Sequence, residues 1–202
     1  MHQKNRRKIV VIGAHTHPDY VYGLHGGMPW PRSAIIEDRR HFRETTTITD
    51  EGRKNLLIAG RLTFEAIGNV LPNRYMGIIS HELTGEPCHI GEDLFLGDSV
   101  PKLVTWAEMN IPNLGDIYLI GGELIWSEGF TIATHAYITT VYHSMKEQQG
   151  TRKLPISLSM QAGRAGFIRE SRPKFFNSDW NGPTCVEISR YWNPDRGLPN
   201  WT

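Results

Sequence analysis

Short apolar runs alternate with amphipathic segments through most of the chain. Runs rich in apolar residues occur at residues 9–14, 55–60, 75–80, 117–120 and 136–142. Continuous runs of this length are typical of strands that are buried on both faces of a sheet. Amphipathic stretches at 33–47, after residue 60, at 100–109 and at 123–130 predict helices between these strands.

The pattern changes near the C-terminus, where two strand-like segments flank a turn. Phe175 to Asp179 and Val186 to Tyr191, joined through Asn181, Gly182 and Pro183, predict an antiparallel hairpin. The whole pattern predicts an α/β fold, with a central mixed, mostly parallel β-sheet flanked by helices and a C-terminal antiparallel hairpin. Ligands are expected at the carboxyl ends of the parallel strands.

Composition adds limits to this picture. With 202 residues, 39% of them hydrophobic and 21% charged, the chain is expected to form a single domain over 1–202, with a basic N-terminal extension (1–8) and a C-terminal tail (193–202). A net charge of +1 gives no reason to expect nucleic-acid or membrane binding. The two cysteines, Cys88 and Cys185, fit a reducing compartment, and we expect a cytoplasmic protein.

The first predicted helix carries an acid on its apolar side. At 3.6 residues per turn one stripe holds Ala34, Ile35, Asp38, Phe42 and Thr45. A carboxylate that points inward needs hydrogen-bond partners or shifts its pKa, because burying it unpaired costs several kcal/mol. The pattern leaves two readings open: Asp38 meets a ligand, or it lies at the edge of the stripe in solvent.

Glycines mark two predicted strand ends. Gly60 permits a tight turn into the next helix, where Thr63 is placed to cap the helix and Arg61 adds positive charge. Helix N-termini favour phosphate, although a plain strand-turn-helix unit with a surface arginine fits equally well. Gly121 and Gly122 end a later strand and would let a ligand approach the backbone closely.

A His-x-His pair follows the first predicted strand. His15 and His17 resemble the opening metal motif of amidohydrolase barrels, which makes a metal-dependent hydrolase one alternative. Such a barrel typically needs about 250 residues and eight strand-helix repeats. Loop histidines are mostly solvated, so we predict no metal site.

Several motifs occur in an order that is typical of one family. They are Gly23 with Met28-Pro29-Trp30, Asp38 four residues before Phe42, the segment Ala59 to Gly68, Leu71-Pro72-x-Arg74, Ile120-Gly121-Gly122 and Tyr137-Ile138-Thr139. In this set and order the chain resembles dihydrofolate reductases of viral or bacterial type, from about Ile9 to Trp192. The resemblance implies the dihydrofolate reductase fold.

The resemblance also implies a substrate site. Asp38 looks like the single carboxylate that holds the pterin ring, and Thr139 like the hydroxyl that supports it. Arg74 resembles the arginine that binds the α-carboxylate of the glutamyl tail. The loop from Gly23 would form a mobile lid, and its end places Met28 and Trp30 in the implied catalytic set. The walls of the substrate site would come from Ile12, Ala14, Phe42, Ile67, Leu71 and Ile120.

The implied cofactor is NADPH. Arg61, Thr63 and the glycine pair resemble contacts to its phosphates, and Ser80 lies near the position of the adenosine 2′-phosphate. Trp126 stands where the family usually has tyrosine, and Leu62 and His81 stand where polar or hydroxyl side chains are common. The full implied set is Ala14, Gly23, Leu24, Gly60, Arg61, Leu62, Thr63, Ser80, His81, Ile120, Gly121, Gly122, Glu123, Leu124 and Trp126.

The implied activity is NADPH-dependent reduction of 7,8-dihydrofolate to 5,6,7,8-tetrahydrofolate by a monomer. Hydride would pass to C6, and a water admitted by the lid would protonate N5. Three alternatives remain: a reductase of the riboflavin-pathway type, a folate- or nucleotide-binding structural component with weak turnover, and a metal-dependent hydrolase that uses His15 and His17.

Overall fold

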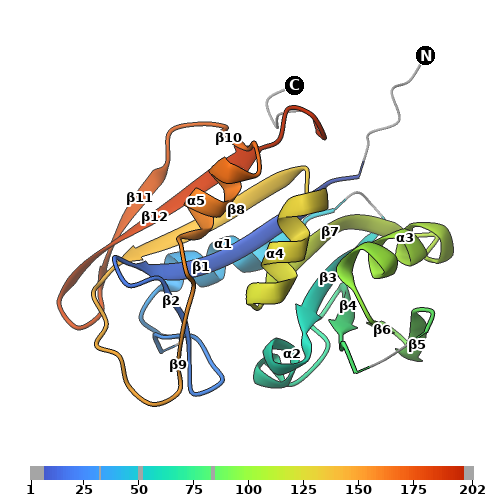
Figure 1. Cartoon of the computed structure of the whole chain (residues 1–202), viewed down its shortest axis with the longest axis horizontal. Coiled ribbons are helices and arrows are strands. Elements are labelled where there is room, and N and C mark those ends of the chain that lie inside the picture. Colours follow the sequence, from blue (N-terminus) through green and yellow to red (C-terminus); the bar gives the residue numbers. More distant parts are fainter. Residues whose placement is uncertain (1–6, 32, 50–51, 83–84, 198–202) are drawn as a thin grey trace.

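A mixed β-sheet runs through the centre of the molecule (Figure 1). The computed structural model describes residues 7–31, 33–49, 52–82 and 85–197, and in these ranges the sheet has ten strands. The strands are β1 (Ile9–His17), β3 (Lys54–Gly60), β4 (Arg74–Ile79), β5 (Cys88–Gly91), β6 (Leu94–Gly97), β7 (Leu114–Gly121), β8 (His135–Tyr142), β10 (Ile168–Arg169), β11 (Lys174–Asp179) and β12 (Pro183–Trp192).

The strand order is β10-β12-β8-β1-β7-β3-β4-β6-β5, with β11 paired to the outer part of β12. The five central strands and β6 pair in parallel. Antiparallel pairs occur on both sides, where β12 joins β8, β10 and β11, and where β5 joins β6. The predicted α/β class, with a mostly parallel sheet and a C-terminal antiparallel hairpin, is confirmed.

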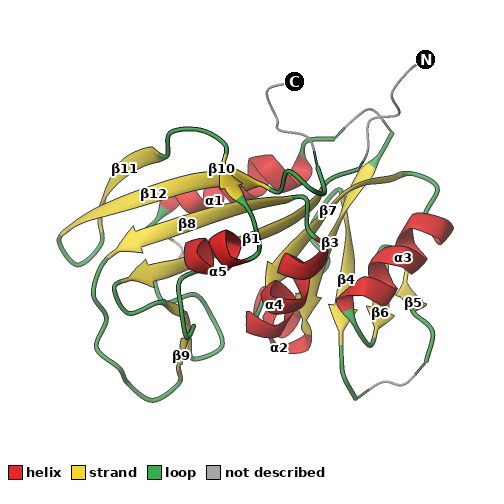
Figure 2. Cartoon of the chain, turned by 45° about the horizontal axis from the view of Figure 1, so that its top comes forward, coloured by secondary structure: helices red, strands yellow, loops and turns green. Residues whose placement is uncertain are grey.

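Helices cover both faces of the sheet (Figure 2). They are α1 (Ile36–Thr47), α2 (Arg61–Ile67), α3 (Val100–Asn110), α4 (Glu123–Ile132) and α5 (Leu158–Arg164). The largest core cluster joins α3, α4 and α5 to one face, and a second cluster joins α1 and α2 to the other. The central strands are apolar on both sides because helices cover both faces of the sheet. Within the described ranges, none of these helices has the length and apolar character needed to cross a membrane.

Two helix starts differ from the sequence prediction. Helix α1 begins at Ile36 and not at Ser33, because the amide of Ala34 donates to the carbonyl of Pro31 at 3.0 Å in a turn that precedes the helix. In α2 the N-cap is Gly60, which uses no side-chain hydrogen bond. Thr63 lies in the third helical position and is not a cap.

Three further departures concern strands and helices that the apolar pattern missed. β2 (Val21–Leu24) pairs with β9 (Thr151–Lys153) in a separate two-stranded sheet, so the predicted lid loop begins as a strand. Neither α5 nor β10 was predicted. β1 continues through His15 and His17, which the sequence placed in a loop.

The chain ends were predicted as an extension and a tail, and residues 1–6 and 198–202 of these lie outside the described residues. The guanidinium Nε of Arg7 donates to the carbonyl of Gly115 at 2.6 Å. Asn193 is 1% exposed, and Arg196 donates to the carbonyl of Phe130 at 2.7 Å. Residues 193–197 are therefore part of the folded body, because these polar groups are satisfied by it.

Candidate active site

The acid on α1 meets a hydroxyl from the sheet. Asp38 lies in the first turn of the helix and is half-buried, and Thr139 on β8 is 3% exposed. Burial raises the pKa of Asp38, and a hydrogen bond from the Thr139 hydroxyl partly offsets this by stabilising the charged form. The structure thus brings together the two residues that the motifs singled out.

An apolar wall surrounds this pair. Side chains from β1, β7, α1, α2 and the loop after α2 meet in the second core cluster, which includes the predicted substrate residues Ile12, Phe42, Ile67, Leu71 and Ile120. The strand members are buried, whereas those from the helices and the loop are only partly buried. An apolar ring system placed beside Asp38 would lie against this wall.

Two tyrosines in the same wall were given no role by the sequence, although Tyr137 belongs to one of the motifs. Tyr118 lies two residues before Ile120 on β7, and Tyr137 two residues before Thr139 on β8, so each shares a strand face with a predicted residue. Both are buried, and burial raises the pKa of Tyr118. The period of two along each strand was the signal that would have identified them.

Two hydrogen bonds hold the side chain of Arg74 at the start of β4. Its side chain is 6% exposed, its Nε donates to the carbonyl of Pro72 at 3.0 Å, and its Nη1 donates to the hydroxyl of Thr46 at 2.9 Å. A guanidinium has five N–H donors, so these two bonds orient it while leaving capacity for an acidic ligand. Burial lowers the pKa of Arg74, which remains a cation.

Two glycine turns come together at the carboxyl ends of β3 and β7. A Cβ at Gly60 would lie 3.8 Å from the amide nitrogen of Gly122, and a Cβ at Gly122 would lie 3.8 Å from the hydroxyl of Thr63. Gly121 has a φ of +118°, which favours glycine, and its peptide bond to Gly122 is cis. The two turns place Gly60, Thr63 and Gly122 close together at this edge, and helix starts of this kind favour phosphate groups.

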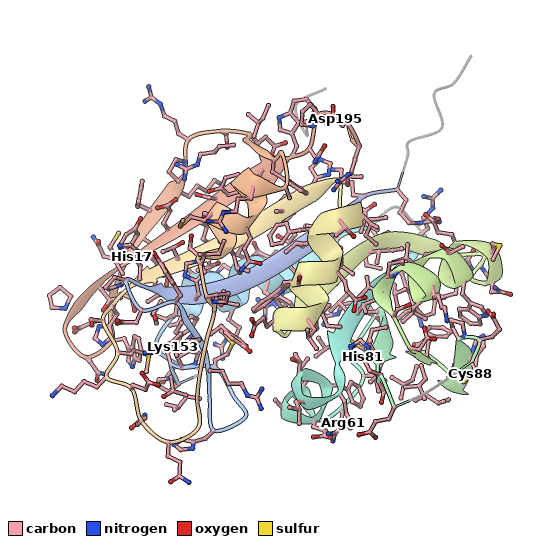
Figure 3. All side chains as sticks on the ribbon, viewed as in Figure 1. His17, Arg61, His81, Cys88, Lys153 and Asp195 are labelled. Carbon is pink, nitrogen blue, oxygen red and sulfur yellow. The ribbon has the colours of Figure 1, made fainter. Side chains whose placement is uncertain are left out.

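Charged and polar side chains surround that edge. Nη1 of Arg61 lies 2.7 Å from Oε1 of Glu65, and Nε2 of His81 lies 3.9 Å from Oε1 of Glu128. Figure 3 shows Arg61 and His81 on the same side of the molecule. Leu62 is 47% exposed beside Arg61, and the amide of Ser80 donates to the main chain of β6. One cationic side chain, that of Arg61, and one imidazole, that of His81, therefore lie near the glycine edge.

Trp126 fills the space between β1 and the glycine turn. Its indole Nε1 donates to the carbonyl of Ile12 at 3.0 Å. A Cβ at Gly13 or at Gly121 would lie 2.8 Å from the indole ring. The indole of Trp126, which is wider than a tyrosine ring, thus depends on Gly13 and Gly121 to leave room for it.

Tyr22 lies over the start of α4 and was also missed. Its ring meets that of Trp126 edge to face, with centroids 5.4 Å apart. The backbone of Glu123 and the side chain of Arg152 hydrogen-bond its phenolic oxygen, and burial raises its pKa. The phenol therefore occupies the N-terminus of α4, next to the glycine pair that the resemblance gave to the cofactor phosphates. Its place in β2 carried no sequence signal, because β2 itself was not predicted.

The rest of the lid forms a short hairpin. The main chains of Leu24 and Gly27 exchange hydrogen bonds of 3.0 and 2.9 Å, and Gly23 lies opposite Arg152 in the β2–β9 pair. Met28 is 47% exposed. Trp30 is 6% exposed, and its ring meets that of Trp180 at 6.0 Å in the third core cluster, which also holds Ala14.

The fold and this geometry define an α/β protein with one carboxyl group facing an apolar wall and a glycine-lined edge suited to a nucleotide. The sequence model of the family described as Dihydrofolate reductase matches residues 8–157. The chain therefore belongs to the dihydrofolate reductase family, whose members reduce dihydrofolate with NADPH. The family match does not favour the riboflavin-pathway reductase, the structural component or the metal-dependent hydrolase.

Similar proteins carry the same name. The dihydrofolate reductase of Saccharomyces cerevisiae is 34% identical over 142 residues, which cover 66% of this chain and 66% of the yeast protein. That of Sus scrofa is 29% identical over 145 residues, 66% of this chain and 72% of the pig protein. The viral dihydrofolate reductase of Saimiriine herpesvirus 2 is 26% identical over 131 residues, 61% of this chain and 59% of the viral protein.

Proposed function

We propose that this chain catalyses the NADPH-dependent reduction of 7,8-dihydrofolate to 5,6,7,8-tetrahydrofolate. The observation that carries the proposal is the Asp38 carboxyl group, supported by Thr139 and set beside an apolar wall. A carboxylate in such a place matches a flat heterocycle that presents two neighbouring N–H donors. The pterin ring of dihydrofolate does so through N3 and its 2-amino group.

The substrate is held at both ends in this proposal. Asp38 accepts the two pterin N–H groups, and Phe42, Ile67 and Leu71 pack on the apolar body, where their exposed edges face outward from the core cluster. Arg74 binds the α-carboxylate of the glutamyl tail with the donors that Pro72 and Thr46 leave available. Two anchors fix the orientation of the ring, which lowers the entropic part of the barrier.

The glycine edge fits the cofactor. Gly60, Thr63 and Gly122 lie close together where β3 and β7 end, and Arg61 and His81 supply positive or hydrogen-bonding groups. The proposed contacts are Ala14, Gly23, Leu24, Gly60, Arg61, Leu62, Thr63, Ser80, His81, Ile120, Gly121, Gly122, Glu123, Leu124 and Trp126. We infer NADPH and not NADH, because the neighbouring Ser80 and His81 can face a 2′-phosphate.

Bound NADPH supplies a hydride from C4 of its nicotinamide to C6 of dihydrofolate. Asp38 orients the pterin and stabilises the positive charge that develops on the ring, and N5 takes its proton from a water. The lid, including Met28 and Trp30, excludes bulk water and strengthens these electrostatic effects. All proposed contacts come from one chain, so a single-domain monomer suffices for the reaction.

We also infer a cytoplasmic location. Cys88 is an exposed free thiol, and a reducing compartment keeps such a group reduced. Fractionation of the expressing cells, followed by blotting for the chain, tests this inference, and recovery in an oxidising compartment would contradict it.

One assay tests the proposed reaction. The purified chain is mixed with dihydrofolate and NADPH, and the loss of the nicotinamide absorbance band is followed with and without a chelator. Turnover that the chelator leaves unchanged is expected. Tight folate binding without turnover would favour the structural component, and turnover abolished by the chelator would contradict the proposal.

A further inference from the structure

A polar cavity lies on the face of the sheet opposite Asp38. Successive residues of a strand point to opposite faces, so Thr140 points away from the site that its neighbour Thr139 serves. In register with Thr140 stand His15 on β1 and Glu187 on β12. These residues, with His17 and Tyr142, line a cavity of about 150 Å³ beside the start of α5.

His15 lines this cavity and carries an unpaired ring nitrogen. Its Nδ1 lies 2.8 Å from the carbonyl oxygen of Thr16, and a carbonyl only accepts, so Nδ1 carries the proton. Nε2 is then unprotonated and carries a lone pair. The residue is 1% exposed, and Nε2 is buried without a hydrogen-bond partner. A metal-binding histidine has this arrangement, because the bond at one ring nitrogen orients the other.

A second imidazole lies next to the first. His17 is two residues further along β1, on the same face, and is exposed, so its side chain can turn toward Nε2 of His15. Its ring lies against that of Tyr142, with centroids 5.3 Å apart, and Tyr20 borders both imidazoles. Two imidazoles at this spacing on a strand can chelate one ion.

A buried carboxylate gives the cavity negative character. Glu187 is 7% exposed and accepts a hydrogen bond of 2.6 Å from the hydroxyl of Tyr142. Ser189 also donates to it, and the guanidinium of Arg169 reaches the same side of the carboxylate at 3.4 Å. The hydroxyl of Tyr142 donates its hydrogen to Glu187, and its oxygen keeps lone pairs that can accept a hydrogen bond. The cavity wall thus offers acceptor oxygens to the waters of a bound ion, while Arg169 partly balances the charge of Glu187.

We propose that this cavity binds one divalent transition-metal ion of the zinc or nickel type through Nε2 of His15 and the ring of His17. Imidazole nitrogen suits these ions. The proposal replaces the sequence-based prediction that the chain has no metal site. No three His, Cys, Asp or Glu side chains in the described part of the chain are arranged as a metal site. Water must then complete the coordination sphere, with Glu187 and Tyr142 behind it.

Nickel is the probe for the test, in a Cys88→Ser background that removes an exposed thiol. Binding is measured by calorimetry without folate or NADPH, so the result does not depend on the proposed reaction. One equivalent of Ni²⁺ is expected to bind, and His17→Ala is expected to weaken binding about tenfold or more. His17 and Cys88 lie at opposite ends of the molecule (Figure 3), so the background change leaves the site intact.

The matched control is His89→Gln, which removes an exposed imidazole beside Cys88 and should leave Ni²⁺ affinity unchanged. A crystal soaked in Ni²⁺ should show an anomalous scattering peak between His15 and His17. The proposal is overturned if the peak lies only elsewhere, if density between the imidazoles shows water alone, or if His17→Ala binds Ni²⁺ like the parent.

Discussion

The hydroxyl of Thr139 on β8 hydrogen-bonds the carboxyl group of Asp38 on α1. Burial raises the pKa of Asp38 despite this bond, so the empty site disfavours the charge that the proposed reaction needs. Because its folded-state pKa lies above the unfolded value, the contribution of Asp38 to stability is greatest below the unfolded pKa and is lost as pH rises through the folded-state pKa. The site thus gives up some stability at neutral pH for function.

Asp38→Asn should therefore abolish most activity while making the empty protein more stable. The amide keeps the shape but removes the charge, and kcat/KM at neutral pH should fall on the order of 100-fold. The free energy of unfolding should rise by about 1 kcal/mol, because no buried charge remains. Steady-state kinetics and thermal denaturation measure the two effects.

The control for this change is Glu37→Gln on the same turn of α1. The helix period places Glu37 off the stripe that holds Asp38, so its kcat/KM should stay near the wild-type value. If Glu37→Gln lost activity and Asp38→Asn kept it, the assignment of the pterin anchor would be wrong.

Arg74→Leu should weaken the binding of dihydrofolate by about 30-fold, equivalent to about 2 kcal/mol for a charged hydrogen bond. The effect should fall on KM more than on kcat, because the glutamyl tail is remote from the reacting carbon. Thr46 also donates to the carbonyl of Phe42, so the substitution leaves its hydroxyl satisfied. A dihydropteridine without the tail should bind wild type and variant equally; a difference would place Arg74 elsewhere in the site.

His41 on α1 should make the protein sensitive to acid. Burial, with smaller contributions from the charges of Arg190 and Lys174, lowers the pKa of His41 from 6.5 to about 4. Below pH 6.5 the unfolded chain binds a proton at His41, whereas the folded chain binds it only near pH 4. The free energy of unfolding therefore falls as the pH drops between these two values. His41→Gln should remove about 2 kcal/mol of that loss.

Urea denaturation at neutral pH and near pH 4 measures the difference. His25→Gln, on the exposed lid hairpin, serves as the control and should keep the wild-type pH dependence. Equal acid losses in wild type and His41→Gln would show that His41 is protonated in the folded protein.

Gly13 and Trp126 should be energetically coupled. A Cβ at Gly13 would lie 2.8 Å from both the Trp126 ring and Leu158, so Gly13→Ala should cost about 2 kcal/mol of stability. In a Trp126→Tyr background the cost should shrink by about 1 kcal/mol, because one of the two clashes is gone. Gly163→Ala, where a Cβ meets nothing within 4 Å, is the control and should cause no loss. Strict additivity would refute the coupling.

Tyr22→Phe should tighten NADPH binding about fivefold, corresponding to about 1 kcal/mol for one hydrogen bond. In the structure the backbone of Glu123 at the start of α4 hydrogen-bonds the phenolic oxygen of Tyr22. Phenylalanine lacks this oxygen and would leave the backbone donor available to a phosphate. Quenching of tryptophan fluorescence by NADPH measures the affinity. Tyr75→Phe on β4 is the control, and weaker binding by Tyr22→Phe would show that the phenol contacts the cofactor favourably.

The parts of the fold that could be predicted are those in which local apolar pattern and burial agree. The central strands are apolar on both sides because helices cover both faces, and Asp38 stood out because it broke a regular stripe. β2 and β9 could not be seen, because four and three residues carry no reliable period and pair across about 130 positions. The same gap hid Tyr22, whose role depends on where β2 packs.

The separate β2–β9 sheet and the main sheet should also differ in local stability. Only a few backbone pairs join these strands, and none of the pairs described for β2 or β9 involves the main sheet. Local unfolding of this ribbon can therefore proceed without breaking the ladder between β1 and its neighbours. We therefore expect the β2–β9 ribbon to open more often than the whole molecule unfolds, and hydrogen exchange of its amides would measure this.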